Sequence, residues 1–490
     1  MSRPDARFAL AVLALVAVLG WVNITTHEMG RDELHSWGVA LTSHSVSELR
    51  ANYDYDRHPR LWFFSLWALS CVAQSPFAMI ALSLAFSLAG AWIVLAYAPF
   101  PRLVRVLYVL GYLHLYEYGT LSRGYTQGEF FALWICAAYP LAAVRPLLIA
   151  VPVFLLAQTS LYGAFLAGAF GVVLAVDLFA DRDASPRARA LIGTAVALGL
   201  AVALWSLLPK PDSDEEGYAW CFHFDGARLL DALCVIGQAL VPVPDPTFHY
   251  WCSNFLDAYL PLQLGVSVFL AFASACVLAS SRRGALFFGV MALAIVGFAY
   301  VKTAGQIRHH GHLFLALFFA CWLARAGEKT VAWSDGRARL LGGLLALHAV
   351  AGLGASIADW VWPFSQSAAV ASWLREHHLE DAELIGEPDA IVAPIGVLLG
   401  RPLYFLDTNR TALFVVFRDR KHLFDPAALA AKLRGPRPVY WITNRPFVPG
   451  DPATGTSVVA GVPLAYERVM ATGDAIRWDE RYWVYRVTPR

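Results

Sequence analysis

Long apolar segments, separated by short polar loops, follow one another from residue 8 to residue 361. Several are shorter than the roughly 20 residues that a straight membrane-spanning helix needs. They cover residues 8–26, 77–97, 103–116, 125–141, 146–158, 163–180, 190–208, 258–281, 284–301, 312–325 and 340–361. The pattern predicts a multi-spanning α-helical membrane protein with about 11 transmembrane helices.

The composition supports this prediction. The 490 residues are 58% hydrophobic and 15% charged, with a mean hydropathy of +0.51, whereas about a quarter of a typical soluble domain is charged. Arg3 and Arg7 precede the first apolar segment, but no small-residue cleavage site follows it, so we expect it to be retained as a helix. The net charge of +1 gives no indication of a nucleic-acid partner.

Basic residues in alternate loops predict the topology. Arginine and lysine occur near 102–105, 145, 182–189, 282–283 and 325–339. Loops that carry such residues are usually cytoplasmic. We therefore expect a cytoplasmic N-terminus and place residues 27–76, 117–124, 209–257, 302–311 and those after 362 on the outer side. Arginine greatly outnumbers lysine, and alanine and leucine abound; this composition fits a bacterial chain from a GC-rich genome, so we expect the bacterial inner membrane.

After residue 362 the charges return and short strands alternate with helices. Strands are expected at 382–388, 401–407, 437–444 and 481–489, helices at 367–378 and 425–435, and either structure at 391–400. Such alternation predicts a small α/β domain. We divide the chain into a membrane domain, 1–362, and a periplasmic α/β domain, 363–490. The second has no glycine fingerprint and no nucleophile elbow, so we expect the chemistry in the first.

The first outer loop is predicted to contain two juxtamembrane helices. Residues 32–41 place their apolar side chains on one helical face. Residues 59–73 form an aromatic helix that lies along or dips into the outer interface, because the next apolar segment, 77–97, has to run inward. Pro59 fits the first turn of that helix.

The unusual polar residues gather in outer segments, beginning with the acidic pair Asp32 and Glu33. Ionisable groups at the ends of membrane spans are costly unless they face a wet cavity or partners, which makes them candidates for function. Asp32 and Glu33 are either an exposed acid pair bound to neighbouring arginines, or they include a general base that takes a proton from an attacking hydroxyl.

Several cationic and aromatic residues are expected on the same outer face. Arginines suit a phosphate ligand, because their forked donors match its oxygens. The candidates for binding a substrate or a lipid phosphate are His58, Arg123, Tyr125, Lys302, Arg308 and His309. His58 fits equally a helix start, a phosphate donor or a metal ligand.

A metal site and a disulfide are left open by the sequence. Histidines 309, 310 and 312 allow a metal site, but no oxygen-rich cage accompanies them. We therefore assign no metal ligand and no cofactor, and leave a divalent cation open. One outer loop carries Cys221, Cys234 and Cys252, which an oxidising compartment would permit to form one disulfide of undetermined pairing.

Four motifs in order resemble those of GT-C glycosyltransferases, specifically the protein O-mannosyltransferases and the aminoarabinose transferases of bacterial lipid A. They are the acidic pair in RDELHSW, the helix start in HPRLWFF, the arginine in SRGYTQGEFF and the late arginine in IRHHGHLF. The resemblance covers the membrane region to about residue 325, and the C-terminal domain is also similar.

The resemblance implies transfer of a sugar, with inversion, from a polyprenyl-phosphate carrier to an extracytoplasmic acceptor, which would be a cell-envelope lipid, glycan or protein. The enzyme would be a hexosyl- or pentosyltransferase. Asp32 would be the base, Glu33 would orient the acceptor or Asp32, and Arg123 and Arg308 would neutralise the departing phosphate. In the aminoarabinose branch an acid stands two residues after the arginine, where this chain has Tyr125; Glu117, the nearest acid before Arg123, is a secondary candidate.

Two other function classes stay open. A transporter or flippase of lipid-linked sugars would use the same arginines to guide a phosphate, but it predicts polar residues deep within several spans. A ligase or polymerase of the O-antigen type would carry a large basic outer loop midway along the chain, whereas residues 212–216 of the corresponding loop are acidic.

Overall fold

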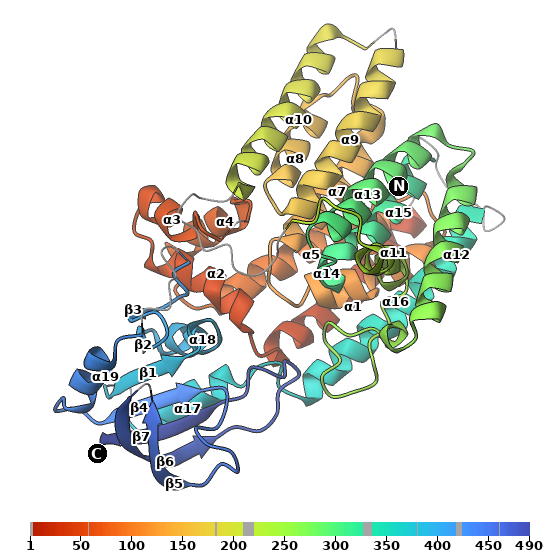
Figure 1. Ribbon diagram of the computed structural model, residues 1–490. Helices are drawn as coiled ribbons and strands as arrows, with labels where there is room; N and C mark the ends of the chain where they lie inside the picture. Colours follow the sequence, from red (N-terminus) through yellow and green to blue (C-terminus); the bar gives the residue numbers. More distant parts are fainter. Residues whose placement is uncertain are drawn as a thin grey trace.

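The computed structural model describes residues 3–56, 58–181, 184–208, 220–326, 336–379, 381–417, 424–459 and 461–490. Parts of two loops predicted to be cytoplasmic, 182–189 and 325–339, lie outside the described residues. The described chain forms a helical region and a C-terminal sheet. Figure 1 shows the sheet at one end of the helical region, next to α2.

Seven helices are long and apolar enough to cross a membrane, among the described residues. Each coincides with one of the predicted apolar segments. They are α1 (Arg3–Thr26), α5 (Phe77–Tyr97), α9 (Leu161–Ala180), α10 (Pro186–Leu207), α12 (Leu260–Leu278), α13 (Arg282–Val301) and α16 (Gly336–Val361).

The other four predicted segments form shorter helices. They are α6 (Arg102–Val109) with the π-helical turn η1 (Tyr112–Tyr118), α7 (Tyr125–Ala138) with the 3₁₀ turn η2 (Tyr139–Leu141), α8 (Leu147–Ala157), and α15 (His312–Leu323), which follows the short α14 (Ile307–His310). All residues of α15 are buried. The apolar side chains of this helix therefore pack in the core of the helical region. At the break between α6 and η1, a Cβ on Gly352 of α16 would lie 2.8 Å from Leu110 O, so only glycine permits this approach.

Residues 220–257 of the loop 209–257 contain structure that the sequence did not indicate, whereas the acidic residues 212–216 lie outside the described residues. The loop contains α11 (Gly226–Leu240), whose N-terminus is capped by Asp225, and the 3₁₀ turn η3 (Phe255–Ala258) follows. The helix packs against α12 and α13. Arg228 and Asp231 interrupt its apolar residues, which is why the pattern did not reveal it.

The first outer loop contains both predicted helices, α2 (Arg31–Thr42) and α4 (Leu61–Ser70), and also the short α3 (Val46–Tyr53). α4 begins at Leu61 with Arg60 as N-cap, so Pro59 precedes the helix and is not in its first turn. α2 packs against α4 on one side and against a helix of the C-terminal region, α18, on another.

The C-terminal region is a seven-stranded sheet of order β3-β2-β1-β4-β7-β6-β5. Strands β1, β2 and β4 are parallel, and the other pairings are antiparallel. α17 and α18 cover one face and α19 the other. The elements are α17 (Ser367–Glu376), β1 (Glu383–Glu387), α18 (Asp389–Leu399), β2 (Leu403–Phe405), β3 (Arg410–Ala412), α19 (Pro426–Leu433), β4 (Val439–Thr443), β5 (Thr454–Val459), β6 (Val462–Ala471) and β7 (Trp483–Pro489). The alternating elements were predicted, whereas β3 and the β5–β6 hairpin were not.

Candidate active site

Asp32 lies in the first turn of α2, and three guanidinium groups converge on its Oδ2 atom. Arg123 Nη1 is 3.1 Å away, Arg477 Nη1 3.4 Å and Arg308 Nη2 3.7 Å. The three arginines come from the loop before α7, from the loop between β6 and β7, and from α14. Residues far apart in the chain therefore meet at one carboxylate oxygen.

The charge around Asp32 keeps its carboxylate ionised. Burial alone would raise the pKa of Asp32, but the guanidinium groups of Arg123, Arg477 and Arg308 outweigh this effect and hold the pKa well below its usual value. When Asp32 is the anion that these three arginines share, its carboxylate is therefore a weak proton acceptor. A second anion that shared these cations would raise its pKa towards the range of a general base.

Glu33 is buried and fixes the position of α2. Its Oε2 accepts from the amide of the N-cap residue Gly30 at 2.9 Å, and its Oε1 accepts from the Ser122 amide at 2.8 Å. Because Ser122 directly precedes Arg123, the same carboxylate sets the distance between Asp32 and Arg123. Glu33 is among the residues that line the smaller cavity, but both of its oxygens accept from backbone amides, so the geometry favours a positioning role.

His27 joins Glu33 to the last long helix. Its ring nitrogens lie 3.1 Å from Glu33 Oε2 and 2.7 Å from Asp359 Oδ2, and all three side chains are buried. Burial acts to lower the pKa of His27, but the carboxylates of Asp359 and Glu33 outweigh it and raise the pKa well above its usual value. The protonated ring therefore links α1, α2 and α16.

The His27 linkage predicts a pH-dependent stability. A pKa that is raised on folding stabilises the fold fully below the unfolded value of about 6.5, and this contribution is lost as the pH rises through the folded value. We expect the melting temperature of the purified protein to fall as the pH increases above about 6.5. The variant His27→Gln should be less stable at low pH and approach the wild type at high pH; parallel curves would contradict the linkage.

Trp251 supports two of the arginines. The guanidinium carbons of Arg308 and Arg477 each lie 5.1 Å from the centre of its ring. Its Nε1 donates to Glu117 Oε2 at 3.2 Å, and Tyr112 Oη donates to the same oxygen at 3.0 Å. Glu117, predicted as a secondary candidate, is thus buried one side chain away from the arginine cluster.

Aromatic rings line the other side of Arg123. Its guanidinium carbon is 5.6 Å from the centre of the Tyr125 ring, and His309 packs against Tyr125 and stacks on Tyr162. Tyr125 and His309 were both predicted from the sequence. Their aromatic rings lie next to Arg123 and form one wall of the site.

Two cavities meet at Arg123. The larger is lined by His58, Trp62, Tyr125 and Ser160 among others, and the exposed His58 lies at its edge. The smaller is lined by Asp32, Trp251, Phe364 and Arg477 among others. Arg123 is common to both linings, so a ligand in the first cavity reaches the charged cluster through it.

Not every predicted residue belongs to this cluster. Lys302 lies at the end of α13, with its Nζ 4.8 Å from the centre of the Trp220 ring, and lines neither cavity. Conversely, Arg477 and Trp251 were not predicted. Arg477 stands in a charged stretch, 477–481, that looks like an ordinary surface loop, and Trp251 lies in a loop whose fold the sequence does not reveal.

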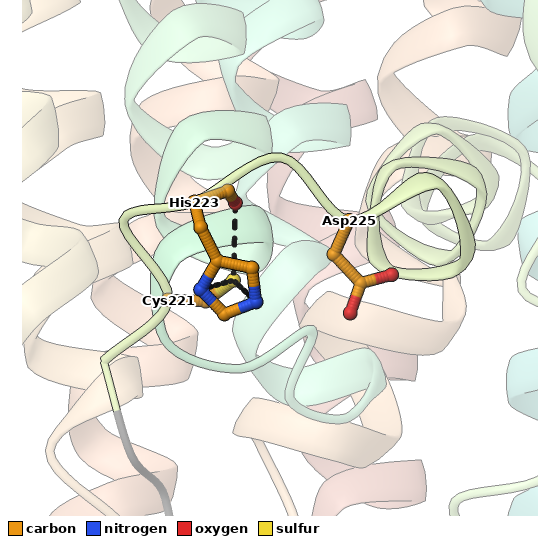
Figure 2. A group of neighbouring side chains, drawn as sticks. All are labelled: Cys221, His223 and Asp225. Carbon is orange, nitrogen blue, oxygen red and sulfur yellow. Dashed lines mark hydrogen bonds between the residues drawn. The ribbon is translucent and has the colours of Figure 1, made fainter.

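Outside this site, one group of three potential metal ligands exists among the described residues: Cys221, His223 and Asp225. Figure 2 shows them on the loop before α11. The Cys221 sulfur is 3.9 Å from both ring nitrogens of His223, whose lone pairs diverge, and Asp225 Oδ1 caps α11. One ligand atom from each of the three lies within 4.8 Å of the others. Cys221, Cys234 and Cys252 are free thiols, so the disulfide that the sequence permitted is not formed.

Comparison with known proteins identifies the fold. No protein-family model and no curated protein matches the chain. The structure is similar to the crystal structure of ArnT from Cupriavidus metallidurans bound to undecaprenyl phosphate, with a TM-score of 0.51, 14% sequence identity and coverage of 97% of each chain. The chain therefore has an ArnT-like fold, in agreement with the GT-C resemblance, and it has helices long and apolar enough to cross a membrane. The count of about 11 spans stays a prediction.

Proposed function

We propose that the chain is an integral membrane glycosyltransferase that transfers a monosaccharide from a polyprenyl-phosphate carrier to a lipid, glycan or protein of the cell envelope. The observation that carries the proposal is the convergence of Arg123, Arg308 and Arg477 on Asp32. Three guanidinium groups that face one carboxylate oxygen offer more donors than this oxygen can accept, and arginine forks suit phosphate. The ArnT-like fold over 97% of the chain supports a polyprenyl-phosphate donor.

The proposed reaction is a single displacement with inversion. The acceptor oxygen attacks the anomeric carbon while Asp32 takes the hydroxyl proton. The bond between that carbon and the phosphate oxygen breaks, and its electron pair stays on the phosphate of the carrier. The arginines stabilise this growing negative charge, so the leaving group needs no acid. Because the incoming phosphate shares the arginines, it also makes Asp32 a better base.

The cavities suggest where the substrates lie. Asp32 lines the smaller cavity, which Phe364 and Arg477 close on the side of the C-terminal sheet. We assign the acceptor hydroxyl to this cavity, because the base must reach it. The larger cavity, with its aromatic wall and His58 at its edge, then takes the donor.

The predicted placement of the chain is kept as part of this proposal. It comprises the bacterial inner membrane, a cytoplasmic N-terminus, about 11 crossings, and a periplasmic α/β domain, 363–490, after a membrane domain, 1–362. Asp32, Arg123 and Arg308 then face the periplasm, where the acceptor would be a component of the cell envelope.

Direct assay with lipid-linked sugars tests the proposal. The purified protein, in lipid nanodiscs, would be incubated with undecaprenyl-phosphate hexoses and pentoses and with cell-envelope lipids as acceptors. We expect release of undecaprenyl phosphate that depends on the acceptor, measured by mass spectrometry. Movement of intact donor across a bilayer without sugar transfer would instead support a flippase, and failure to bind undecaprenyl phosphate would contradict a carrier-dependent enzyme of either kind.

A further inference from the structure

The loop between β6 and β7 of the C-terminal sheet enters the candidate active site. Its backbone is attached to the segment that follows α16: the amides of Ile476 and Arg477 donate to the carbonyls of Pro363 and Phe364 at 2.9 and 3.1 Å. In return, the Gln366 amide donates to the Glu480 carbonyl at 3.0 Å. This part of the loop is therefore fixed where the helical region meets the sheet.

Arg477 is the side chain that this loop extends into the site, and it is only 8% exposed. Its Nε is held by its own loop, 2.9 Å from Glu480 Oε1 and 3.2 Å from Asp479 Oδ1. Its Nη1, at the other end of the fork, lies 3.4 Å from Asp32 Oδ2. Glu480 and Asp479 thus orient the guanidinium so that its terminal donors face the centre of the cluster.

The guanidinium donors at this centre outnumber the oxygen that they face. Asp32 Oδ2 is a single acceptor for donors from Arg123, Arg308 and Arg477, and the buried Nε of Arg308 has no hydrogen-bond partner among the described residues. Carboxylates commonly pair with one guanidinium through two oxygens, whereas a phosphate offers more acceptor oxygens and, as a monoester, up to two negative charges. The arrangement around Asp32 therefore has donors that a phosphate could use, although Asp479 and Glu480 offset part of the positive charge.

We propose that Arg477 completes the lipid-phosphate site, so that the C-terminal domain supplies one of the groups that bind the carrier. This inference rests on the proposed function and extends it. The phosphate lies where Arg123 joins the two cavities, and Arg477 binds it from the side of the smaller cavity, while Asp32 stays available to the acceptor hydroxyl. The active site is then complete only when the sheet is docked on the helical region.

A purely structural role for Arg477 makes a different prediction, and Arg31 separates the two. Arg31 also joins α2 to the loop, with Nη1 2.6 Å from Asp479 Oδ2 and its amide donating to Glu480 Oε1 at 3.1 Å. It makes no hydrogen bond to Asp32. Arg481, on the same loop, is exposed and pairs with Asp474 at 2.9 Å, so it is a control for the loss of a loop arginine.

The test measures binding of undecaprenyl phosphate to the full-length protein in detergent, without turnover, together with melting temperature. Arg477→Ala should weaken binding about 10- to 100-fold, the effect of losing a charge-assisted hydrogen bond, and Arg477→Lys should restore part of it. Arg31→Gln should lower the melting temperature but change affinity less than about threefold, and Arg481→Ala should change neither.

The outcomes distinguish the inference from the function on which it rests. Wild-type affinity in Arg477→Ala, or an equal loss in Arg31→Gln, would overturn the role of Arg477. If Arg123→Gln nevertheless weakened binding, the proposed function would stand. If the wild type itself failed to bind undecaprenyl phosphate, both proposals would fall.

Discussion

Replacing Asp32 with asparagine should lower the rate of sugar transfer by about 10²- to 10⁴-fold, the contribution typical of a general base. Asparagine keeps the size of the side chain and can still contact the arginines, but it cannot take the proton of the acceptor hydroxyl. It also removes the negative charge that competes with a phosphate for Arg123, Arg308 and Arg477. Binding of undecaprenyl phosphate should therefore be unchanged or tighter.

The separation of rate from affinity is the decisive measurement for Asp32. Turnover would be followed as carrier release at saturating donor, and affinity by titration with undecaprenyl phosphate. Asp474→Asn is a suitable control, because this exposed carboxylate pairs only with Arg481 among the described ion pairs. Wild-type turnover in Asp32→Asn would remove the proposed base, and a parallel loss of rate and affinity would indicate a structural role.

Replacing Arg308 with glutamine should lower turnover by roughly 10²- to 10³-fold, because a positioned cation stabilises the charge that develops on the leaving phosphate. Arg308 faces Asp32 Oδ2 at 3.7 Å and rests on Trp251. Lys302, predicted from the same outer segment, instead lies over Trp220. Lys302→Gln should therefore keep turnover within about twofold of the wild type, as is usual for a single surface charge.

The two variants test whether turnover depends on the position of a cation or only on its charge. Both residues are cations of one short segment, and their substitutions remove the same charge. Equal losses in the two variants would mean that the outer face acts through its overall charge, and not through guanidinium groups placed at one phosphate.

Membrane insertion can be predicted from the sequence because it depends on local composition. A segment of about 20 apolar residues buries its backbone polar groups in its own hydrogen bonds, so length and hydropathy alone indicate a span. The seven long helices follow this rule. Segment 103–116 does not: it is divided between α6 and η1. Gly352 approaches the backbone closely at this break, and such a contact involves a helix more than 200 residues away.

The C-terminal region shows the same limit. β1 and β4 each bury a short apolar run and were predicted. The edge strand β5 alternates exposed and half-buried residues, so the sequence pattern of this part of the hairpin resembles a loop, and only pairing with β6 defines it as a strand.

By itself, the sequence determined a chain of membrane helices followed by an α/β region, and it indicated that Asp32, Arg123 and Arg308 belong to segments on one face. Each membrane-spanning helix takes the chain to the opposite side of the membrane, so every second loop lies on the same side. This inference needs only the position of each apolar segment. Only the tertiary structure decided that these residues meet at one oxygen, that Lys302 points elsewhere, and that Arg477 joins them. Those distances depend on how α2, α14 and the β6–β7 loop pack together, and packing between distant segments leaves no periodic signal in the sequence.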